Sequence, residues 1–151
     1  MFETKQDIIE KIKTTSATLQ NDEIAVLDNS NEIIDQKYLG IYYEKQYDQN
    51  GDAWNLVKAS KHFRRGKMSE KALSMLSKYD TSRNDLTTKS LLLAALHTTK
   101  GAALADLNEL EDAIVEAQMA LRHNPYSPYP YNLMGRIAYQ SGNPQEGGSS
   151  P

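Results

Sequence analysis

The chain has 151 residues, 39% of them hydrophobic, which is enough for one domain with a buried core. It contains no cysteine, so disulfides and thiolate chemistry are excluded, as is typical of a cytoplasmic protein. No apolar run approaches the roughly 18 residues that a membrane span needs, and the N-terminal MFETKQDIIEK lacks the apolar stretch of a signal peptide. We therefore expect a cytoplasmic protein without membrane contact.

The net charge of −3 conceals a segregation of charge along the chain. Residues 1–52 hold five Lys or Arg and eleven Asp or Glu, residues 53–105 hold ten and three, and residues 106–151 hold two and six. An acidic, basic, acidic order predicts either a basic binding surface in the middle of the chain or ion pairs between its segments. Because exposed ion pairs each add little to stability, a binding surface has to be considered.

Helical periodicity dominates the first third of the chain. Apolar residues recur at helical spacing in 6–20, although three Thr and one Ser lower the helix propensity there. A short apolar run follows at 23–27, and 32–47 shows a second helical stripe. For 38–43 a strand is the alternative, since Tyr and Ile favour sheets. The sequence DQNGD at 48–52 is a clear break.

Two shorter helices are predicted next. The first, 53–66, ends at Gly66, because glycine is common just after a helix C-terminus. Ser69 is expected to cap the second. The sequence DTSRND that follows at 80–85 predicts a loop.

Three further helices are predicted after this loop. Residues 87–107 form a long, apolar, Ala-rich pattern, and Asn108 with Glu111 has the spacing of a capping box that opens the next helix. NPYSP ends that helix, and another begins at 129. Helices of about 12 residues joined by short loops predict an all-α fold of antiparallel hairpins.

Similar residues recur at a fixed separation in the second half of the chain. Gly101 and Gly135 are 34 residues apart in the sequence, and so are Asn108 and Gly142. A weaker copy begins near Ala53, but its separation from the next copy is longer, so seven extra residues have to lengthen the following helix. Gly101 and Gly135 are expected where two helices cross too closely for a β-carbon. An unrelated helical bundle is the alternative interpretation.

The better copy resembles the tetratricopeptide repeat, whose period of about 34 residues equals the separation of Gly101 and Gly135. That family places Leu-Gly and Tyr on its first helix, two Ala around an aromatic residue on its second, and a closing Pro. The residues at matching positions here are Gly101, Leu104, Ala113, Ala117, Ala120 and Pro125. The resemblance implies a short α-solenoid of stacked hairpins over 31–147, with an N-terminal helical segment at 1–30 and a flexible tail at 148–151.

The last copy has a first helix and its turn, but the sequence changes to GGSSP where a second helix is expected. Exposed aromatic residues at the end of a solenoid would favour association, including self-association of the chain through its C-terminal end. Tyr131 and Met134, however, fall on the side that is expected to pack back onto the preceding copy.

No catalytic set can be identified. The sequence has no Gly-rich phosphate loop. His62, His97 and His123 stand on three different predicted helices, and none has a second ligand at helical spacing, so no metal site is predicted. The acidic residues of 109–116 are expected on the solvated face of their helix. We therefore expect a protein that is not an enzyme and uses no cofactor.

The segment 58–71 holds six Lys or Arg and is the strongest binding signal. In the tetratricopeptide family the first helix of each copy lines a groove. The resemblance implies binding positions at Trp54, Lys61, Arg64 and Arg65 at one end, a floor at Ala95, Thr98, Ala102, Ala105 and Asp106, and positions at Tyr129, Asn132, Arg136 and Tyr139 at the other end.

Such a basic and aromatic groove would bind an extended or helical peptide with acidic side chains. We therefore expect a scaffold or adaptor with a protein partner. One alternative is a regulatory module of a larger assembly that contacts nucleic acid through 58–71. The other is that the basic helix pairs with the acidic N-terminal segment of the same chain.

Overall fold

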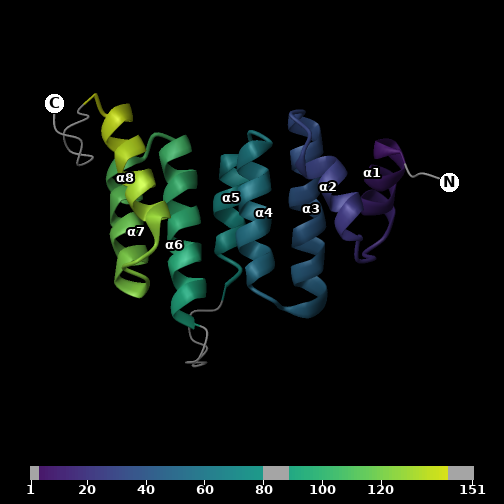
Figure 1. The fold of residues 1–151 in the computed structure, drawn as a ribbon, viewed down its shortest axis with the longest axis horizontal. Helices are drawn as coiled ribbons and strands as arrows, with labels where there is room; N and C mark the ends of the chain where they lie inside the picture. The colour runs from purple at the N-terminus through teal and green to yellow at the C-terminus, as the bar shows by residue number, and fades with distance from the viewer. Residues whose placement is uncertain (1–3, 80–88, 143–151) are drawn as a thin grey trace. The chain divides into compact units, whose positions relative to one another are not determined.

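The computed structural model describes residues 4–79 and 89–142. These residues form eight helices and no strand, so the all-α prediction is confirmed for the described part of the chain (Figure 1). The helices are α1 (Lys5–Thr14), α2 (Asn21–Asp28), α3 (Ile33–Asn50), α4 (Trp54–Arg65), α5 (Ser69–Leu76), α6 (Lys89–Asp106), α7 (Leu110–His123) and α8 (Pro128–Gln140). The chain divides into two compact units, Met1–Tyr79 and Asp80–Pro151. The predicted loop at 80–85 and the predicted tail at 148–151 lie outside the described residues.

In the first unit, α1 and α2 pack with α3 around a common apolar core. The three isoleucines of α1 form its buried face, and they meet Leu27 of α2 and Leu39 of α3 in one cluster. Each aliphatic side chain removed from water contributes about 1.5–3 kcal/mol, so this cluster holds the three helices together. The segment predicted at 1–30 thus shares its core with the helix that follows it.

The helix predicted over 6–20 ends at Thr14 in the structure. The hydroxyls of Thr14 and Thr15 donate to helix carbonyls four residues earlier, at 2.8 Å in each case. Threonine hydroxyls compete with backbone amides in this way and favour a helix end. Leu19 is still buried, but it reaches the core from the non-helical segment, where its amide donates to Tyr42 Oη at 3.1 Å.

An antiparallel hairpin is formed by α3 and α4. The strand considered for 38–43 is not formed, because these residues lie in the middle of α3. Gly40 allows the two helices to approach closely, since a β-carbon there would lie 2.7 Å from the ring of Phe63 on α4. Helix α5 also packs against α4 (Figure 1).

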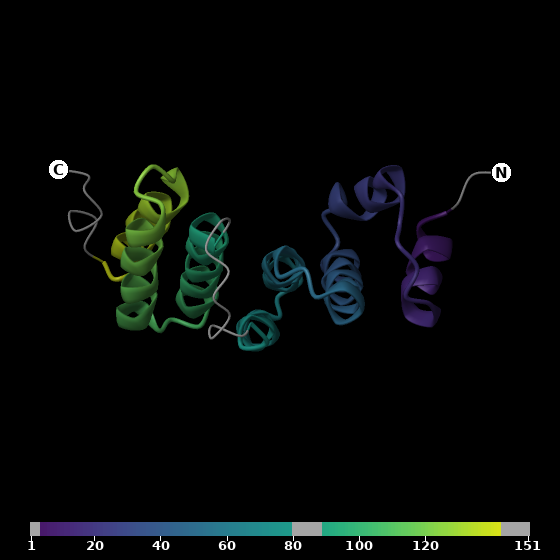
Figure 2. The same cartoon turned by 90° about the horizontal axis from the view of Figure 1, so that it is seen from below.

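In the second unit, α6 and α7 form another antiparallel hairpin, and Figure 2 shows them side by side. Later positions of α6 meet earlier positions of α7: His97 contacts Glu116, and Gly101 lies against Ala113. Residues 94–122 therefore form two antiparallel helices, as the better copy predicts. Helix α8 packs against both of them.

The same turn ends α4, α6 and α8. Lys67, Asn108 and Gly142 are left-handed, with φ of 61°, 62° and 78°, and each lies two residues after its helix ends. In every case the amide of this residue donates to the carbonyl three residues earlier, at 3.0, 3.0 and 3.2 Å. After Lys67 and Asn108 the next amide reaches the carbonyl five residues earlier, at 2.8 and 2.9 Å, and a new helix begins. Asn108 lies 41 residues after Lys67, whereas Gly142 lies 34 residues after Asn108. The difference of seven residues equals the longer separation expected for the copy that begins near Ala53.

This turn corrects two predicted caps, whereas the predicted helix end at Gly66 is confirmed. Asn108 does not open a capping box, because the N-cap of α7 is the residue after it, which makes no side-chain cap hydrogen bond. Met68, not Ser69, is the N-cap of α5. Gly66 does follow α4, but its φ of −83° is open to any residue, and the left-handed position is Lys67.

Replacing Lys67 by Gly is expected to raise the free energy of unfolding by about 0.5–1 kcal/mol. A non-glycine residue in the left-handed region costs roughly 1–2 kcal/mol, and part of the gain is lost to the entropy of glycine in the unfolded chain. Urea unfolding followed by Trp54 fluorescence measures the change. Lys61→Gly, at an exposed position inside α4, is the control and should lose about 1 kcal/mol. A loss of stability at both positions would contradict the turn assigned to Lys67.

Candidate partner-binding surfaces

Four side chains form an exposed stripe along α4. Trp54, Lys58, Lys61 and Arg65 lie four, three and four residues apart, which places them on one face of the helix. We refer to these four residues as the α4 stripe. It contains three of the predicted binding residues, whereas the fourth, Arg64, is half-buried beside it.

Neighbouring helices contact two members of the α4 stripe. Arg65 donates from Nη1 to Asp28 Oδ1 at 2.8 Å and from Nη2 to the Asp28 carbonyl at 3.0 Å. Although partial burial opposes it, the hydrogen bond from Arg65 and the charge of Lys61 keep the pKa of Asp28 below its ordinary value. The Lys58 ammonium lies over the Tyr43 ring, 5.6 Å from its centroid. Lys61 makes no ion pair with any described residue.

His62 projects from the same helix into the core. Its side chain is 3% exposed, and its Nδ1 lies 2.9 Å from Gln36 Oε1. Gln36 Nε2 in turn donates to the carbonyls of Leu27 and Ser30, at 3.0 and 2.9 Å. Burial, aided by the positive charge of Lys61, lowers the pKa of His62 to about 4. His62 is therefore a neutral core residue at neutral pH, not a cation of the predicted basic surface.

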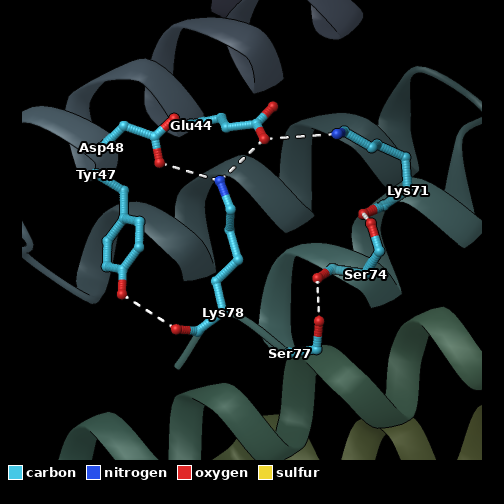
Figure 3. A network of polar contacts seen from close by, with 7 residues as sticks. All are labelled: Glu44, Tyr47, Asp48, Lys71, Ser74, Ser77 and Lys78. Atoms are coloured by element: carbon cyan, nitrogen blue, oxygen red, sulfur yellow. Dashed lines mark hydrogen bonds and ion pairs between the residues drawn. The ribbon is translucent and has the colours of Figure 1, made fainter. Parts of the chain in front are cut away.

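Acidic residues of α3 neutralise the lysines at the end of the first unit (Figure 3). Lys78 Nζ lies 3.1 Å from Glu44 Oε2 and 3.0 Å from Asp48 Oδ1. Lys71 Nζ lies 3.5 Å from the same oxygen of Glu44. Such exposed pairs each contribute little to stability, but they place carboxylates directly beside the basic region. Pairing between the basic region and the acidic N-terminal region is thus present at α5 as well as at α4.

In the second unit, the predicted binding residues of α6 and α8 lie side by side. Tyr129 and Tyr139 are 69% and 79% exposed, and Asn132 and Arg136 lie between them on the same stripe of α8. Arg136 Nη2 lies 2.5 Å from Asp106 Oδ1, which joins this stripe to the end of α6. Within the predicted floor, three small residues of α6 are half-buried and Ala105 is fully buried. We refer to the following residues together as the α6–α8 surface: Ala95, Thr98, Ala102, Tyr129, Asn132, Arg136 and Tyr139.

The predicted binding residues of α4 and those of α8 belong to different units. Each surface is built entirely from residues of its own unit. Each can therefore be tested separately by substitutions in that unit.

Tyr131 does not pack onto the preceding hairpin. It is 57% exposed, whereas Pro130, Leu133 and Ile137 form the buried side of α8. Met134 is half-buried. The prediction for Tyr131 was therefore wrong, because the buried side of α8 begins one position before it and continues two positions after it.

A buried carboxylate joins α6 and α7. Glu116, predicted on a solvated face, is 9% exposed, with Oε2 2.6 Å from His97 Nδ1 and Oε1 3.4 Å from Lys100 Nζ. The rings of His97 and His123 stack with centroids 5.5 Å apart. Burial and the neighbouring His97 lower the pKa of His123, which disfavours the cation at this helix end. In the sequence, Glu116 lies at helical spacing among Ala113, Ala117 and Ala120, and this spacing is the signal for its burial.

Within 4–79 and 89–142, no group of three or more His, Cys, Asp or Glu side chains could hold a metal ion. None of the helices in these ranges combines the length and the hydrophobicity needed to cross a membrane.

No protein-family model, no curated protein sequence and no solved structure matches the chain.

Proposed function

We propose that the chain is a cytoplasmic, non-enzymatic scaffold that binds a protein partner, with the stacked hairpins of a short tetratricopeptide-like α-solenoid. Support comes from the turn that recurs at Lys67, Asn108 and Gly142 and from the α6–α7 hairpin. In a helical repeat, the first helix of each copy offers its surface to a partner. By the spacing of the turns, this first helix is α4 in the first unit, and it is α6 and α8 in the second unit.

The exposed aromatic residues of the α6–α8 surface are the observation that carries this proposal. Tyr129 and Tyr139 expose 69% and 79% of their area on one stripe. Tyrosine offers a large contact area at a low cost in side-chain entropy, and its hydroxyl can hydrogen-bond at the rim of an interface. The α6 residues of this surface are small and half-buried, so they leave room for a peptide backbone to approach the helix.

The α4 stripe favours a partner with acidic side chains. Lys58 and Lys61 are exposed, and Trp54 adds an aromatic ring that is 38% exposed. Arg65 is already bound to Asp28, so it contributes less than its charge suggests. We therefore assign the recognition of carboxylates mainly to Lys58 and Lys61.

Nucleic acid is disfavoured as the partner by the acids that border the basic region. Asp28, Glu44 and Asp48 each lie 3.5 Å or less from a basic side chain of α4 or of the segment from α5 to Tyr79. A phosphate backbone that follows these cations would meet the carboxylates too, and fewer counterions would be released.

The double substitution Tyr129→Ser with Tyr139→Ser is expected to remove most partner binding. Truncating one aromatic anchor commonly costs about 1–2 kcal/mol, or roughly 5–30-fold in affinity. Affinity purification with quantitative mass spectrometry measures the retained partners. Tyr126→Ser is the matched control, because this tyrosine is 93% exposed but precedes α8. Equal partner retention by the double variant and the control would reject the α6–α8 surface.

For the α4 stripe, Lys58→Glu with Lys61→Glu should weaken the same association, and more so at low salt because screening is weaker there. Lys13→Glu, an exposed reversal on α1, is the control. A gel-shift titration with a single-stranded RNA at two salt concentrations completes the experiment. If the Lys58→Glu, Lys61→Glu variant loses RNA binding but keeps its protein partners, nucleic acid would replace protein as the proposed class of partner.

A further inference from the structure

Arg65, the last member of the α4 stripe, holds a carboxylate of its own chain. Its Nη1 donates to Asp28 Oδ1 at 2.8 Å, and its Nη2 donates to the Asp28 carbonyl at 3.0 Å. The charge of Lys61, the neighbouring member of the stripe, acts on the same carboxylate. Asp28 thus occupies the end of the stripe, where a carboxylate of an acidic partner would bind.

Asp28 is the last residue of α2, a position that disfavours its charge. The carbonyl groups at a helix C-terminus carry a partial negative charge, so a carboxylate is repelled there. The last turn of α2 contains no basic residue that would offset this repulsion. The compensating charge comes from α4 instead, through Arg65. The Asp28 carboxylate therefore contributes to the occupation of Arg65 and not to the stability of α2 as a helix.

The contact between Asp28 and Arg65 can exchange with a partner. Both side chains are about 40% exposed, and exposed pairs of this kind contribute little to stability. The end of α2 is also held by other contacts, because Leu27 is fully buried and Gln36 Nε2 donates to the carbonyls of Leu27 and Ser30. Asp28 can therefore release Arg65 while α2 stays in place.

A second carboxylate of the same unit offers a comparison. Glu44 Oε2 lies 3.1 Å from Lys78 Nζ and 3.5 Å from Lys71 Nζ (Figure 3). Neither of these lysines belongs to the α4 stripe. Loss of the Glu44 charge would change the net charge of the unit as much as loss of the Asp28 charge, but it would free cations at a different place.

We propose that Asp28 is an internal competitor of the partner, whose own carboxylate displaces Asp28 from Arg65 when the α4 stripe is bound. This inference rests on the proposed function, because it requires an acidic partner at the stripe. It gives Arg65 a role in the bound chain that the free chain conceals. The planar guanidinium matches a carboxylate in a bidentate contact. The partner is therefore expected to carry an Asp or Glu at the position that faces Arg65.

A fluorescein-labelled hexaglutamate peptide is the probe. It is titrated into the full chain by fluorescence anisotropy at about 0.1 M salt, where attraction between distant charges is largely screened. Asp28→Asn removes the competing charge and should tighten binding about three- to fivefold. Glu44→Gln removes the same charge away from the stripe and should change binding by less than about twofold. In an Arg65→Gln chain, adding Asp28→Asn should also change binding by less than about twofold, because the contested side chain is absent.

Circular dichroism checks that each variant is folded, and Asp28→Ser replaces Asp28→Asn if that variant is not. Equal binding by the unchanged chain and by Asp28→Asn would overturn the inference and leave the α4 stripe as a binding surface. Equal gains from Asp28→Asn and Glu44→Gln would overturn it as well, since binding would then follow net charge alone. So would a gain that persists in the Arg65→Gln chain. If neither the unchanged chain nor any variant binds the peptide, the acidic partner proposed for the stripe is rejected together with the inference.

Discussion

Gly101→Leu is expected to lower the free energy of unfolding by about 3 kcal/mol or more, whereas Gly135→Leu is expected to raise it by about 0.5–1 kcal/mol. At Gly101 even a β-carbon would lie 3.1 Å from the backbone of Ala113, so a larger side chain forces α6 and α7 apart. At Gly135 the space is open, and the helix gains the higher propensity of leucine over glycine. The two substitutions are identical chemically, and each glycine lies five residues before its helix ends.

Urea unfolding monitored by far-UV circular dichroism gives the two changes, and hydrogen exchange of the amides of α6 and α7 assigns them to the second unit. A small domain is commonly stable by about 5–15 kcal/mol, so the loss at Gly101 would be a large fraction of the total. Losses of similar size at both glycines would mean that Gly135 is covered in solution.

Acidification is expected to destabilise the first unit by up to about 3 kcal/mol between pH 6.5 and pH 4, through His62. Burial lowers the pKa of His62 to about 4 in the folded chain, from an ordinary value of 6.5. Between these values the unfolded chain binds more protons, so stability is complete above pH 6.5 and is lost as the pH falls towards 4. The groups facing this ring are Gln36, Asp28, Tyr43, Lys61 and Arg65.

Trp54 is the only tryptophan of the chain and lies in the first unit, so its fluorescence reports unfolding there separately from the second unit. His62→Asn keeps a hydrogen-bond donor near Gln36 Oε1 but cannot titrate. It should therefore flatten the pH dependence of the free energy of unfolding above pH 4. The pKa of Asp28 is lowered, so its contribution is lost at still lower pH and does not mimic the effect. A wild-type profile as flat as that of His62→Asn would show that His62 is not buried as described.

The sequence predicted the helices better than it predicted the chemistry of the turns that end them. The sequence predicts an N-cap at Asn108, but asparagine also tolerates the left-handed conformation that it adopts here. Either role suits the same residue, and only the backbone path after α6 decides between them. The early end of α1 has a similar cause, because the hydroxyls of Thr14 and Thr15 compete locally with a pattern that is otherwise helical.

The candidate surfaces were harder to predict, because exposure depends on contacts between distant residues. Arg65 binds Asp28, which is far from it in the sequence, and only the segregation of charge hinted at such a pair. Glu116 is buried because α6 supplies His97 and Lys100, while Tyr131 is exposed because no described helix covers it. Periodicity identifies the side of a helix that can be buried, but not whether a neighbour is there to bury it.

The claim that one turn closes α4, α6 and α8 underlies both the proposed scaffold and the comparison of Gly101 with Gly135. Backbone φ angles from NMR scalar couplings and intraresidue amide–Hα distances measure it directly at Lys67, Asn108 and Gly142. Positive φ at all three residues, each two positions after helical chemical shifts end, is the predicted result. A negative φ at Lys67 or Asn108 would contradict the recurrence and remove the equivalence of Gly101 and Gly135.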